Sequence, residues 1–451
     1  DRSKEYYKKL GMNPDKKPFK RDKKAGLLKD IDEEFVKETK EYWLRHYGKS
    51  IDPLLNIVFA NLTGKKDVRV APPVPVLWNE IIPYFNDMNI RVGYSDKNIY
   101  DKLIAAPRSV ESVLKRIRGY YYDKDNNLLT PNNALKILDN YKEDLIIKPR
   151  NSDNGLGIKK AKYNENNHTL DGKPLTIDLI EKEFGYNLVV QKVIKQHKLM
   201  GAPHPSSVNT LRIVTLRWKT QIYYLLSYIR IGVNNNVMDN SGTGGIVVGI
   251  NDEGQFYNYA IDRDLNVFHE HPSTGFSFKE MKEVPGFDES ISYVKKLHER
   301  ILHHDLVSWD IAIDEEAKPV FMEMNFRGPT FIYQLASQKP IFGDLTDEIL
   351  EHIKEKRNIS NRNSDSDYSR LMKKYKKLKK ENNKLVNYLK TQGKKPEDFR
   401  KFILEKDDKI FKLQKENIQQ AKKLSKLKSK IDYMENSKSW KLTAPLRKIK
   451  K

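Results

Sequence analysis

LVSWDIAIDEEAKPVFMEMN spans residues 306–325 of a chain of 451 residues. Two apolar runs, Leu306–Ile313 and Pro319–Asn325, flank the polar segment Asp314–Lys318. Two β-prone runs separated by a short polar break are typical of strands joined in a hairpin. We therefore predict an antiparallel pair of strands in this part of the chain.

The predicted hairpin carries polar side chains that suit a metal ion. Asp310 and Glu323 lie on its neighbouring strands, and Glu323 and Asn325 are two residues apart, so both point to one face. Hard oxygen ligands of this kind suit Mg²⁺, which takes few protein ligands and leaves positions for phosphate oxygens. The alternative is a solvated strand end, or acids that pair with Arg327.

The neighbouring sequence predicts further strands, of which the last four form two more hairpins. These strands cover Leu145–Ile147, Asn187–Gln191, Thr210–Trp218, Gln221–Gly232, Gly242–Ile250 and Gln255–Ile261. Apolar spacing predicts a helix over Ser290–His303, a mostly helical segment over residues 97–140 and a helical lead-in over residues 1–50. The sequence therefore predicts an α+β fold with a largely antiparallel sheet.

The formal net charge of +22 is unevenly distributed along the chain. Residues 361–451 hold 29 basic and 11 acidic side chains, a net of +18, whereas residues 51–360 are nearly neutral, with a net of −1. Arguments about partners must therefore be made segment by segment. The chain has no Cys, which excludes disulfides, thiolate metal sites and a Cys nucleophile. It also lacks an apolar run of about 18 residues, so no membrane-spanning helix is predicted.

A second candidate site follows the strand that ends at Lys148. The sequence Lys148-Pro149-Arg150-Asn151-Ser152-Asp153-Asn154-Gly155-Leu156-Gly157 places a Lys before a loop with glycines. A Lys supplies a positive charge, and glycines let backbone N–H groups approach an anion, so the loop suits a phosphate. It lacks the order of a Walker A loop, and a plain surface loop is the alternative.

Taken together, these elements resemble the ATP-grasp ligases, such as D-alanine–D-alanine ligase. The elements that carry the resemblance are Ser95-Asp96-Lys97, Lys148-Pro149, Asn187–Gln191 with Lys192-Val193-Ile194, and Asp310 with Glu323 and Asn325. More narrowly, the chain is similar to the sugar-transfer-associated branch, also called alpha-L-glutamate-ligase-related and akin to teichuronopeptide biosynthesis proteins. That similarity rests on Gln191 with His197, Ser206–Arg212, Gly244-Gly245-Ile246 and Trp309-Asp310. The resemblance covers roughly residues 90–345, and it implies an ATP-grasp fold of two α+β subdomains.

The resemblance also implies roles for individual residues. Lys97 and Lys148 would bind the ATP phosphates, Gly155 and Gly157 would close over the triphosphate, and Arg212 would contact the γ-phosphate. Gln191, Lys192 and Ile194 would frame adenine, His197 would lie near the ribose, and Asn209 would also bind the cofactor. Asp310, Glu323 and Asn325 would hold one or two Mg²⁺ ions. Two positions depart from the family pattern. Gln191 is uncharged where many relatives have Glu, and Ser308 replaces a basic residue. Arg212, Arg230 or Arg327 would then supply the missing charge, and we count Arg212 and Arg327 as candidate catalytic residues.

The implied reaction is an ADP-forming carboxylate–amine ligation through an acyl phosphate. Both steps build negative charge on oxygen, so they require cations and Mg²⁺ rather than a covalent nucleophile. The implied substrates are a carboxylate and an amine derived from amino acids or from a surface polysaccharide or peptide precursor. A sugar phosphotransferase on the same fold and an inert coiled-coil scaffold are the alternatives.

The last part of the chain has a different pattern. Residues 355–366 are polar and predict a linker, and residues 367–436 follow a four–three apolar spacing that predicts a coiled coil. A homo-oligomer is therefore expected, and the alternative is a lone amphipathic helix docked on the body. The domains predicted before it are residues 1–90, a helical lead-in with an N-terminal subdomain, and residues 91–350, the ATP-grasp domain.

Residues 437–451 form a basic tail that contains Ser439-Trp440-Lys441-Leu442-Thr443-Ala444-Pro445-Leu446-Arg447. This tail resembles one found in bacterial surface-polysaccharide glycosyltransferases. One Trp, apolar residues and Lys/Arg suit attachment to an anionic membrane surface, so we expect a cytoplasmic protein at the inner face of the cell membrane. A soluble oligomerising stalk is the alternative. The Lys runs are not accompanied by a nucleic-acid-binding module, so nucleic acid is not an expected partner.

Two smaller features have competing interpretations. His269 and His271 would point to one face of a strand, which fits either a metal ion or a hydrogen-bonded polar pair. Tyr120–Tyr122 fits either stacking on a sugar or ordinary packing.

Overall fold

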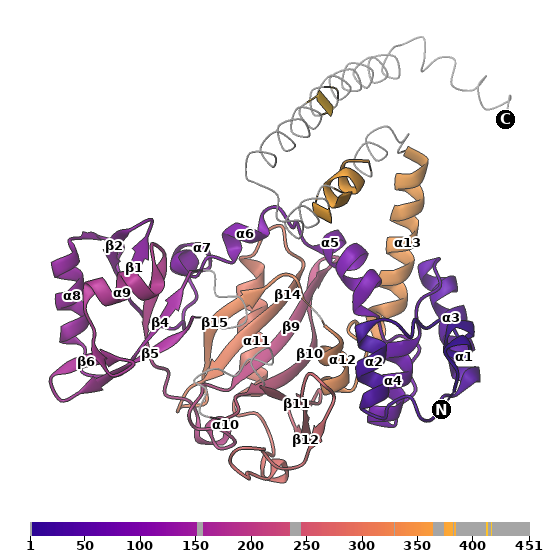
Figure 1. Cartoon of the computed structure of the whole chain (residues 1–451), viewed down its shortest axis with the longest axis horizontal. Coiled ribbons are helices and arrows are strands. Elements are labelled where there is room, and N and C mark those ends of the chain that lie inside the picture. Colours follow the sequence, from indigo (N-terminus) through magenta and orange to yellow (C-terminus); the bar gives the residue numbers. More distant parts are fainter. Residues whose placement is uncertain are drawn as a thin grey trace, which may run out of the picture. The chain divides into compact units, whose positions relative to one another are not determined.

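The computed structural model describes residues 2–150, 157–234, 245–328, 330–363, 374–381, 383–384, 412–413 and 416. The chain divides into two compact units, Asp1–Lys354 and Glu355–Lys451. The first unit contains the two sheets and all the helices that surround them (Figure 1).

The first sheet of this unit has eight strands among the described residues. They are β1 (Ser112–Ile117), β2 (Tyr120–Asp123), β3 (Leu128–Leu129), β4 (Leu145–Pro149), β5 (Lys159–Asn164), β6 (Asn167–Leu170), β7 (Lys173–Pro174) and β8 (Leu188–Lys192). Their order is β3-β2-β1-β8-β4-β5-β6-β7, and each neighbouring pair is antiparallel. The central pairing of β4 with β8 places Ile146 opposite Gln191 and Lys148 opposite Val189.

The second sheet has seven strands among the described residues and is also antiparallel throughout. They are β9 (Thr210–Trp218), β10 (Gln221–Ile231), β11 (Ile246–Ile250), β12 (Phe256–Ile261), β13 (Val267–Phe268), β14 (Leu306–Ile313) and β15 (Pro319–Asn325). Their order is β13-β12-β11-β10-β9-β14-β15. The hairpin predicted over residues 306–325 is therefore confirmed as β14 and β15, with Asp310 directly opposite Glu323.

The helices cover these sheets and build the N-terminal region (Figure 1). They are α1 (Lys4–Lys9), α2 (Lys17–Lys24), α3 (Glu33–Tyr47), α4 (Leu54–Thr63), η1 (Pro73–Ile81), α5 (Ile82–Phe85), α6 (Arg91–Tyr94), η2 (Lys97–Ile99), α7 (Tyr100–Leu103), α8 (Pro131–Asn140), α9 (Ile177–Phe184), α10 (Lys198–Gly201), η5 (Phe278–Glu280), α11 (Phe287–Glu299), α12 (Phe331–Ser337), η6 (Gly343–Leu345) and α13 (Thr346–Asn363). The helical lead-in predicted over residues 1–50 is confirmed as α1, α2 and α3.

The two faces of the seven-stranded sheet belong to different apolar cores. One face packs with α11, and its core includes Ile213, Trp309 and Val294. The other face shares a core with the N-terminal helices, so that Val214 of β9 and Trp43 of α3 belong to the same cluster. Successive side chains along each strand therefore point alternately to the face that packs on α11 and to the face that packs on α12 and the N-terminal helices.

The prediction of a mostly helical segment over residues 97–140 was wrong. Within this segment only the short helices η2 and α7 precede β1, and residues 112–129 contain three strands before α8 begins. Charged residues such as Lys115 and Arg116 are usually exposed to solvent, but both are buried in β1. Lys115 pairs with Asp101 at 2.9 Å and Arg116 with Glu181 at 2.8 Å, so tertiary partners stabilise charges inside a strand.

The C-terminal predictions fall largely outside the described residues. Residues 355–363, which the sequence analysis interprets as the start of a linker, continue α13 as far as Asn363. The predicted coiled coil over residues 367–436 lies outside the described residues except at 374–381, 383–384, 412–413 and 416, which are helical. The tail 437–451 lies outside them entirely. Among the helices that are described, none has the length and apolar character needed to cross a bilayer.

His298 of α11 is buried and forms a hydrogen bond to the seven-stranded sheet. Its protonation makes the stability of the fold depend on pH. The Nδ1 atom of His298 lies 2.7 Å from Thr215 Oγ1, which accepts a hydrogen bond from Trp309 Nε1 at 2.8 Å. Its Nε2 atom lies 3.1 Å from the His304 carbonyl oxygen, so Nε2 donates and the neutral ring satisfies both neighbours. Burial, aided by Arg217, lowers the pKa of His298 to about 3.

We expect this histidine to make the fold sensitive to acid. The unfolded chain binds a proton at His298 below about pH 6.5, whereas the folded chain does not do so until about pH 3. Stability should therefore fall by about 1.4 kcal/mol per pH unit as pH decreases through this window. Urea unfolding of His298→Gln should show a shallower fall than the unmodified chain. Asn61→Ala, which removes no titratable group, is the control and should keep the original slope.

Candidate functional site

The site predicted from the hairpin is centred on Asp310. This carboxylate is 5% exposed and lies on β14 between strands β9 and β15. Arg212 of β9 approaches both its oxygens, with Nε donating to Oδ1 and Nη2 donating to Oδ2 at 2.9 Å. Arg230 of β10 donates from Nη1 to Oδ2 at 3.0 Å. Asp310 is therefore held by two guanidinium groups, one from the adjacent strand β9 and one from β10 beyond it.

The charges of these groups stabilise one another. Burial alone would raise the pKa of Asp310, but Arg212 and Arg230 outweigh it and hold the pKa below its ordinary value. Burial alone would lower the pKa of Arg212, but Asp310 outweighs it and raises that pKa. Asp310 is therefore ionised and both arginines are protonated at neutral pH, which is the state needed to bind anions and a divalent cation.

Glu323 extends the site along β15. It lies opposite Asp310 in the hairpin register, and its carboxylate accepts from Lys97 Nζ at 3.0 Å. Lys97 belongs to η2 and is 9% exposed, so a cation from another element is buried against the strand. Asn325 lies opposite Ser308, and its Nδ2 atom is 3.4 Å from Asp310 Oδ2. The residues predicted as metal ligands and the first predicted lysine therefore come together.

The alternative pairing of the acids with Arg327 is not what the structure has. Arg327 is exposed in the segment after β15, while Arg212 and Arg230 pair with Asp310. In the seven-stranded sheet β9 lies next to β14 and β10 lies one strand further away, so the cations come from residues that are close in the sheet rather than in the chain.

Sequence reasoning missed two tyrosines beside this group. Tyr333 of α12 accepts a hydrogen bond from Arg212 Nη1, and its ring lies 5.1 Å from that of Tyr228 of β10. Both tyrosines are buried. The only signal available in the sequence was the position of Tyr228 on the same strand face as Arg230, two residues further on.

The eight-stranded sheet supplies the second group of predicted residues. Lys148 lies on β4, and Gln191 and Lys192 end β8 beside it. Gln191 is 9% exposed, and Lys192 pairs with Glu111 at 2.7 Å. The strands thus place the phosphate and adenine candidates on neighbouring elements, as expected.

An ion pair connects the two segments that carry the predicted phosphate lysines, Lys97 and Lys148. Asp96, the residue before Lys97, lies 2.8 Å from Arg150, which follows Lys148 by two positions. Asp96 also accepts a hydrogen bond from the Asn98 backbone N–H at 3.1 Å, so it fixes the start of η2. Arg150 lies within the predicted phosphate loop motif, but no role was predicted for it.

The remaining candidates differ in their surroundings. Gly157 has φ +78°, and a Cβ atom there would lie 2.9 Å from Pro149 Cγ. Glycine is therefore required at this position, which precedes β5 and packs against the end of β4. Ile194 is half-buried. His197 caps α10, where Nδ1 accepts from the Leu199 N–H at 3.2 Å. Gly155 lies outside the described residues.

Asn209 is engaged by its own protein. Its side-chain NH₂ donates to the carbonyls of Met200 at 2.8 Å and His204 at 3.3 Å. Its oxygen accepts from Ser207 Oγ at 2.8 Å and from the Gly232 N–H at 3.4 Å. In this structure Asn209 therefore joins α10 to the end of β10.

The pair of histidines has an ordinary explanation. His271 Nε2 lies 2.8 Å from the Gly232 carbonyl oxygen, and its ring stacks on His204 at 5.4 Å rather than pairing with His269. Burial lowers the pKa of His271, which favours a neutral, hydrogen-bonded ring. In the part of the chain that the structure describes, no three His, Asp or Glu side chains gather to hold a metal.

The Asp310 site nevertheless has a donor set that suits Mg²⁺. It offers two carboxylates and one amide oxygen, and Mg²⁺ completes its shell with water and phosphate oxygens rather than with many protein ligands. Asp310 Oδ2 accepts from both arginines, but among the described residues Oδ1 accepts only from Arg212 Nε, so one lone pair of Oδ1 remains available for a cation. Lys97, Arg212 and Arg230 would neutralise the negative charge of a polyphosphate bound at this site.

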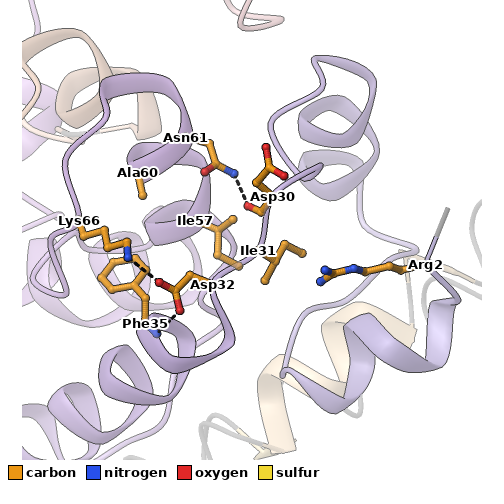
Figure 2. A pocket seen from close by; sticks show the side chains of 9 residues that line it. All are labelled: Arg2, Asp30, Ile31, Asp32, Phe35, Ile57, Ala60, Asn61 and Lys66. Carbon is orange, nitrogen blue, oxygen red and sulfur yellow. Dashed lines mark hydrogen bonds and ion pairs between the residues drawn. The ribbon is translucent and has the colours of Figure 1, made fainter.

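A separate pocket of about 380 Å³ lies among the N-terminal helices (Figure 2). Lys66 and Asp32 form an ion pair at 2.5 Å on one side of it, and Arg2 points toward it from the opposite side (Figure 2). None of the predicted site residues lines this pocket. The chemistry of the Asp310 group, rather than this hollow, therefore identifies the candidate site.

Comparisons with known proteins agree with the family resemblance. A family model described as "Sugar-transfer associated ATP-grasp" matches residues 79–349. No curated protein matched the chain.

Several solved structures are similar to parts of the chain. VanG D-Ala:D-Ser ligase from Enterococcus faecalis is 14% identical, with a TM-score of 0.34, over 58% of this chain and 61% of its own. L-amino acid ligase from Bacillus licheniformis is 10% identical, with a TM-score of 0.34, over 58% of this chain and 48% of its own. D-alanine–D-alanine ligase from Bacillus anthracis is 13% identical, with a TM-score of 0.31, over 58% of this chain and 69% of its own. The chain thus spans less than two thirds of the first two.

Proposed function

The chain belongs to the sugar-transfer associated ATP-grasp family, and from this premise we propose that it is an ATP- and Mg²⁺-dependent carboxylate–amine ligase. The observation that carries the proposal is the arrangement of Asp310 and Glu323, neighbours across two strands, among Lys97, Arg212 and Arg230. Alternating acids and cations at one place suit a metal–polyphosphate complex, since the acids bind the metal and the cations bind phosphate oxygens.

In this proposal ATP transfers its γ-phosphoryl group to a substrate carboxylate, which gives an acyl phosphate and ADP. An amine then attacks the acyl carbon, and phosphate leaves. Lys97 of η2 and Lys148 of β4 hold the phosphates, while Gln191, Lys192 and Ile194 frame the base. Asp310, Glu323 and Asn325 hold Mg²⁺. Arg212 neutralises charge that develops on the transferred group, and Arg230, half-buried and bound to the same carboxylate, is better placed for a second such contact than the exposed Arg327.

We further propose that the acceptor is a precursor of a cell-surface polysaccharide or peptide. The description of the family as sugar-transfer associated supports this substrate class. The heptad pattern of residues 367–436 and the net charge of +18 over residues 361–451 support a homo-oligomer attached to an anionic membrane surface.

A hydroxylamine trap tests the reaction directly. The full chain is incubated with ATP, Mg²⁺, hydroxylamine and a panel of carboxylates that includes amino acids and uronic acids. An activated carboxylate reacts to give a hydroxamate, so ADP and hydroxamate should appear together. ADP release without hydroxamate for any carboxylate, but with a phosphorylated sugar, would contradict the ligase and indicate a phosphotransferase.

Nucleotide binding can be tested without turnover. At a ligand concentration of about 100 Kd, ATP–Mg²⁺ should stabilise the chain by about 2.7 kcal/mol and raise its Tm by several degrees. Glu323→Gln removes a predicted metal ligand and should lose most of that shift. Glu315→Gln, in the exposed turn of the same hairpin, should keep it. Equal shifts in both variants would contradict the role of Glu323, and no shift in the unmodified chain would contradict the ATP site.

A further inference from the structure

α12 is fixed from several directions. It packs on β10, β11 and α4, between the sheet and the N-terminal helices (Figure 1). Its last turn lies so close to β11 that a Cβ atom on Gly249 would be 1.7 Å from the Ala336 carbonyl oxygen. At its first turn, the guanidinium of Arg21 from α2 lies 3.8 Å from the centre of the Phe331 ring. The helix is therefore a rigid connection rather than a surface element.

Gln334 joins this helix to the N-terminal region. Its side chain is fully buried and exchanges two hydrogen bonds with the backbone of Ala71, donating to the carbonyl at 2.8 Å and accepting from the N–H at 2.9 Å. Its oxygen also accepts from the Ile341 N–H at 3.1 Å. A buried amide with all these partners fixes both position and rotation, because breaking any of them leaves a polar group without a partner.

The preceding residue of the same helix contacts the site. Tyr333 accepts from Arg212 Nη1, while Nε and Nη2 of that guanidinium donate to Asp310. Arg212 is thus held on one edge by Asp310 and at its remaining nitrogen by Tyr333. A planar guanidinium held at two places has a defined orientation, whereas one held by a single carboxylate can tilt.

We propose that the N-terminal helical region positions Arg212 through α12, with Gln334 and Tyr333 as positioning residues. Ala71 precedes the residues matched by the family model, 79–349, whereas Gln334 lies within them, so the contact joins the matched region to a segment outside it. The proposal rests on the proposed function in one respect, namely that Arg212 acts on the transferred group. It gives the N-terminal region a role in the reaction beyond packing.

Tyr333→Phe is the first test. The phenyl ring keeps its packing against Tyr228, so only the hydroxyl that accepts from Arg212 is lost. We expect kcat to fall about tenfold, with KM for ATP changed less than about twofold, because a lost charged hydrogen bond corresponds to a change of this size. Tyr257→Phe is the matched control, since its hydroxyl contacts the Ser337 carbonyl at 3.5 Å on the same helix but is remote from Arg212. It should keep the original kcat.

Gln334→Glu is the second test and has a pH signature. A protonated carboxyl can still donate to the Ala71 carbonyl, whereas an ionised one cannot, and burial raises the pKa of such a carboxyl. The kcat of this variant should therefore fall as pH rises, relative to the unmodified chain, at temperatures well below unfolding. A merely structural role would lower Tm and leave this kcat ratio flat.

Crystal structures of both variants separate this inference from the proposed function. A shifted Arg212 guanidinium supports the positioning role whether or not turnover is detected. An unmoved Arg212 in both variants overturns it, as does an unchanged kcat for Tyr333→Phe in a chain that turns over ATP. Failure of the unmodified chain to use ATP contradicts only the proposed function.

Discussion

Asparagine in place of Asp310 is expected to lower ATP turnover by roughly 10²- to 10³-fold and to destabilise the fold. The substitution leaves the buried Arg212 and the half-buried Arg230 around a neutral amide, so two cations lose their shared counter-charge. Removing one partner from a buried ion pair costs about 3–5 kcal/mol. Urea unfolding and steady-state ADP release measure the two effects.

Asp314→Asn is the matched control for this prediction. Asp314 lies in the turn of the same hairpin and pairs with the exposed Arg108 at 3.2 Å, so its loss should cost less than about 1 kcal/mol. Equal unfolding midpoints for the two variants would contradict the central role assigned to Asp310.

The pH dependence of the same pair provides a second check. Because the pKa of Asp310 is below its ordinary value of 3.8, the unfolded chain protonates this group first. Its contribution is therefore complete above about pH 4 and is lost as pH falls below that value. Asp310→Asn should remove this acid-sensitive part and leave the separate loss caused by His298 between about pH 6 and 3.

The strands around the site were predictable because their signals are local. The runs Leu306–Ile313 and Pro319–Asn325 are apolar and bounded by a polar turn, and they form β14 and β15 with the same bounds. Residue alternation then places Glu323 and Asn325 on one face. The metal-ligand hypothesis needed only this spacing and the pairing of two adjacent strands.

The partners of these acids could not be predicted in the same way. Arg230 reaches Asp310 because β10 lies two strands from β14 in the sheet, and sequence spacing does not give strand order. Tyr333 reaches Arg212 from a helix that follows the whole sheet. The strand β1 was not predicted, and the partners that stabilise Lys115 and Arg116 within it lie on other elements. For β1, tertiary context decided the local structure; for Arg230 and Tyr333, it decided which residues meet.

The second large effect is expected at Gly249, where an alanine should destabilise the fold by about 3 kcal/mol or more. The added Cβ would lie 1.7 Å from the Ala336 carbonyl oxygen and 2.7 Å from Tyr257 Cδ2, and the first of these is backbone that cannot rotate away. Either β11 or α12 must therefore move. Because α12 carries Tyr333, such a displacement should also lower turnover, which urea unfolding and ADP release together would reveal.

Gly93→Ala isolates the close approach from the general effect of adding a methyl group. Gly93 is exposed in α6, has no atom within 4 Å of an added Cβ and does not have the positive φ that disfavours alanine. Alanine there should be neutral or slightly stabilising, because glycine in a helix costs about 1 kcal/mol relative to alanine. A Gly249→Ala variant as stable as Gly93→Ala would mean that α12 does not lie against β11 as closely as the structure indicates. It would also weaken the case that this helix holds Arg212 in place, since a helix free to move by the width of a methyl group could not orient a guanidinium.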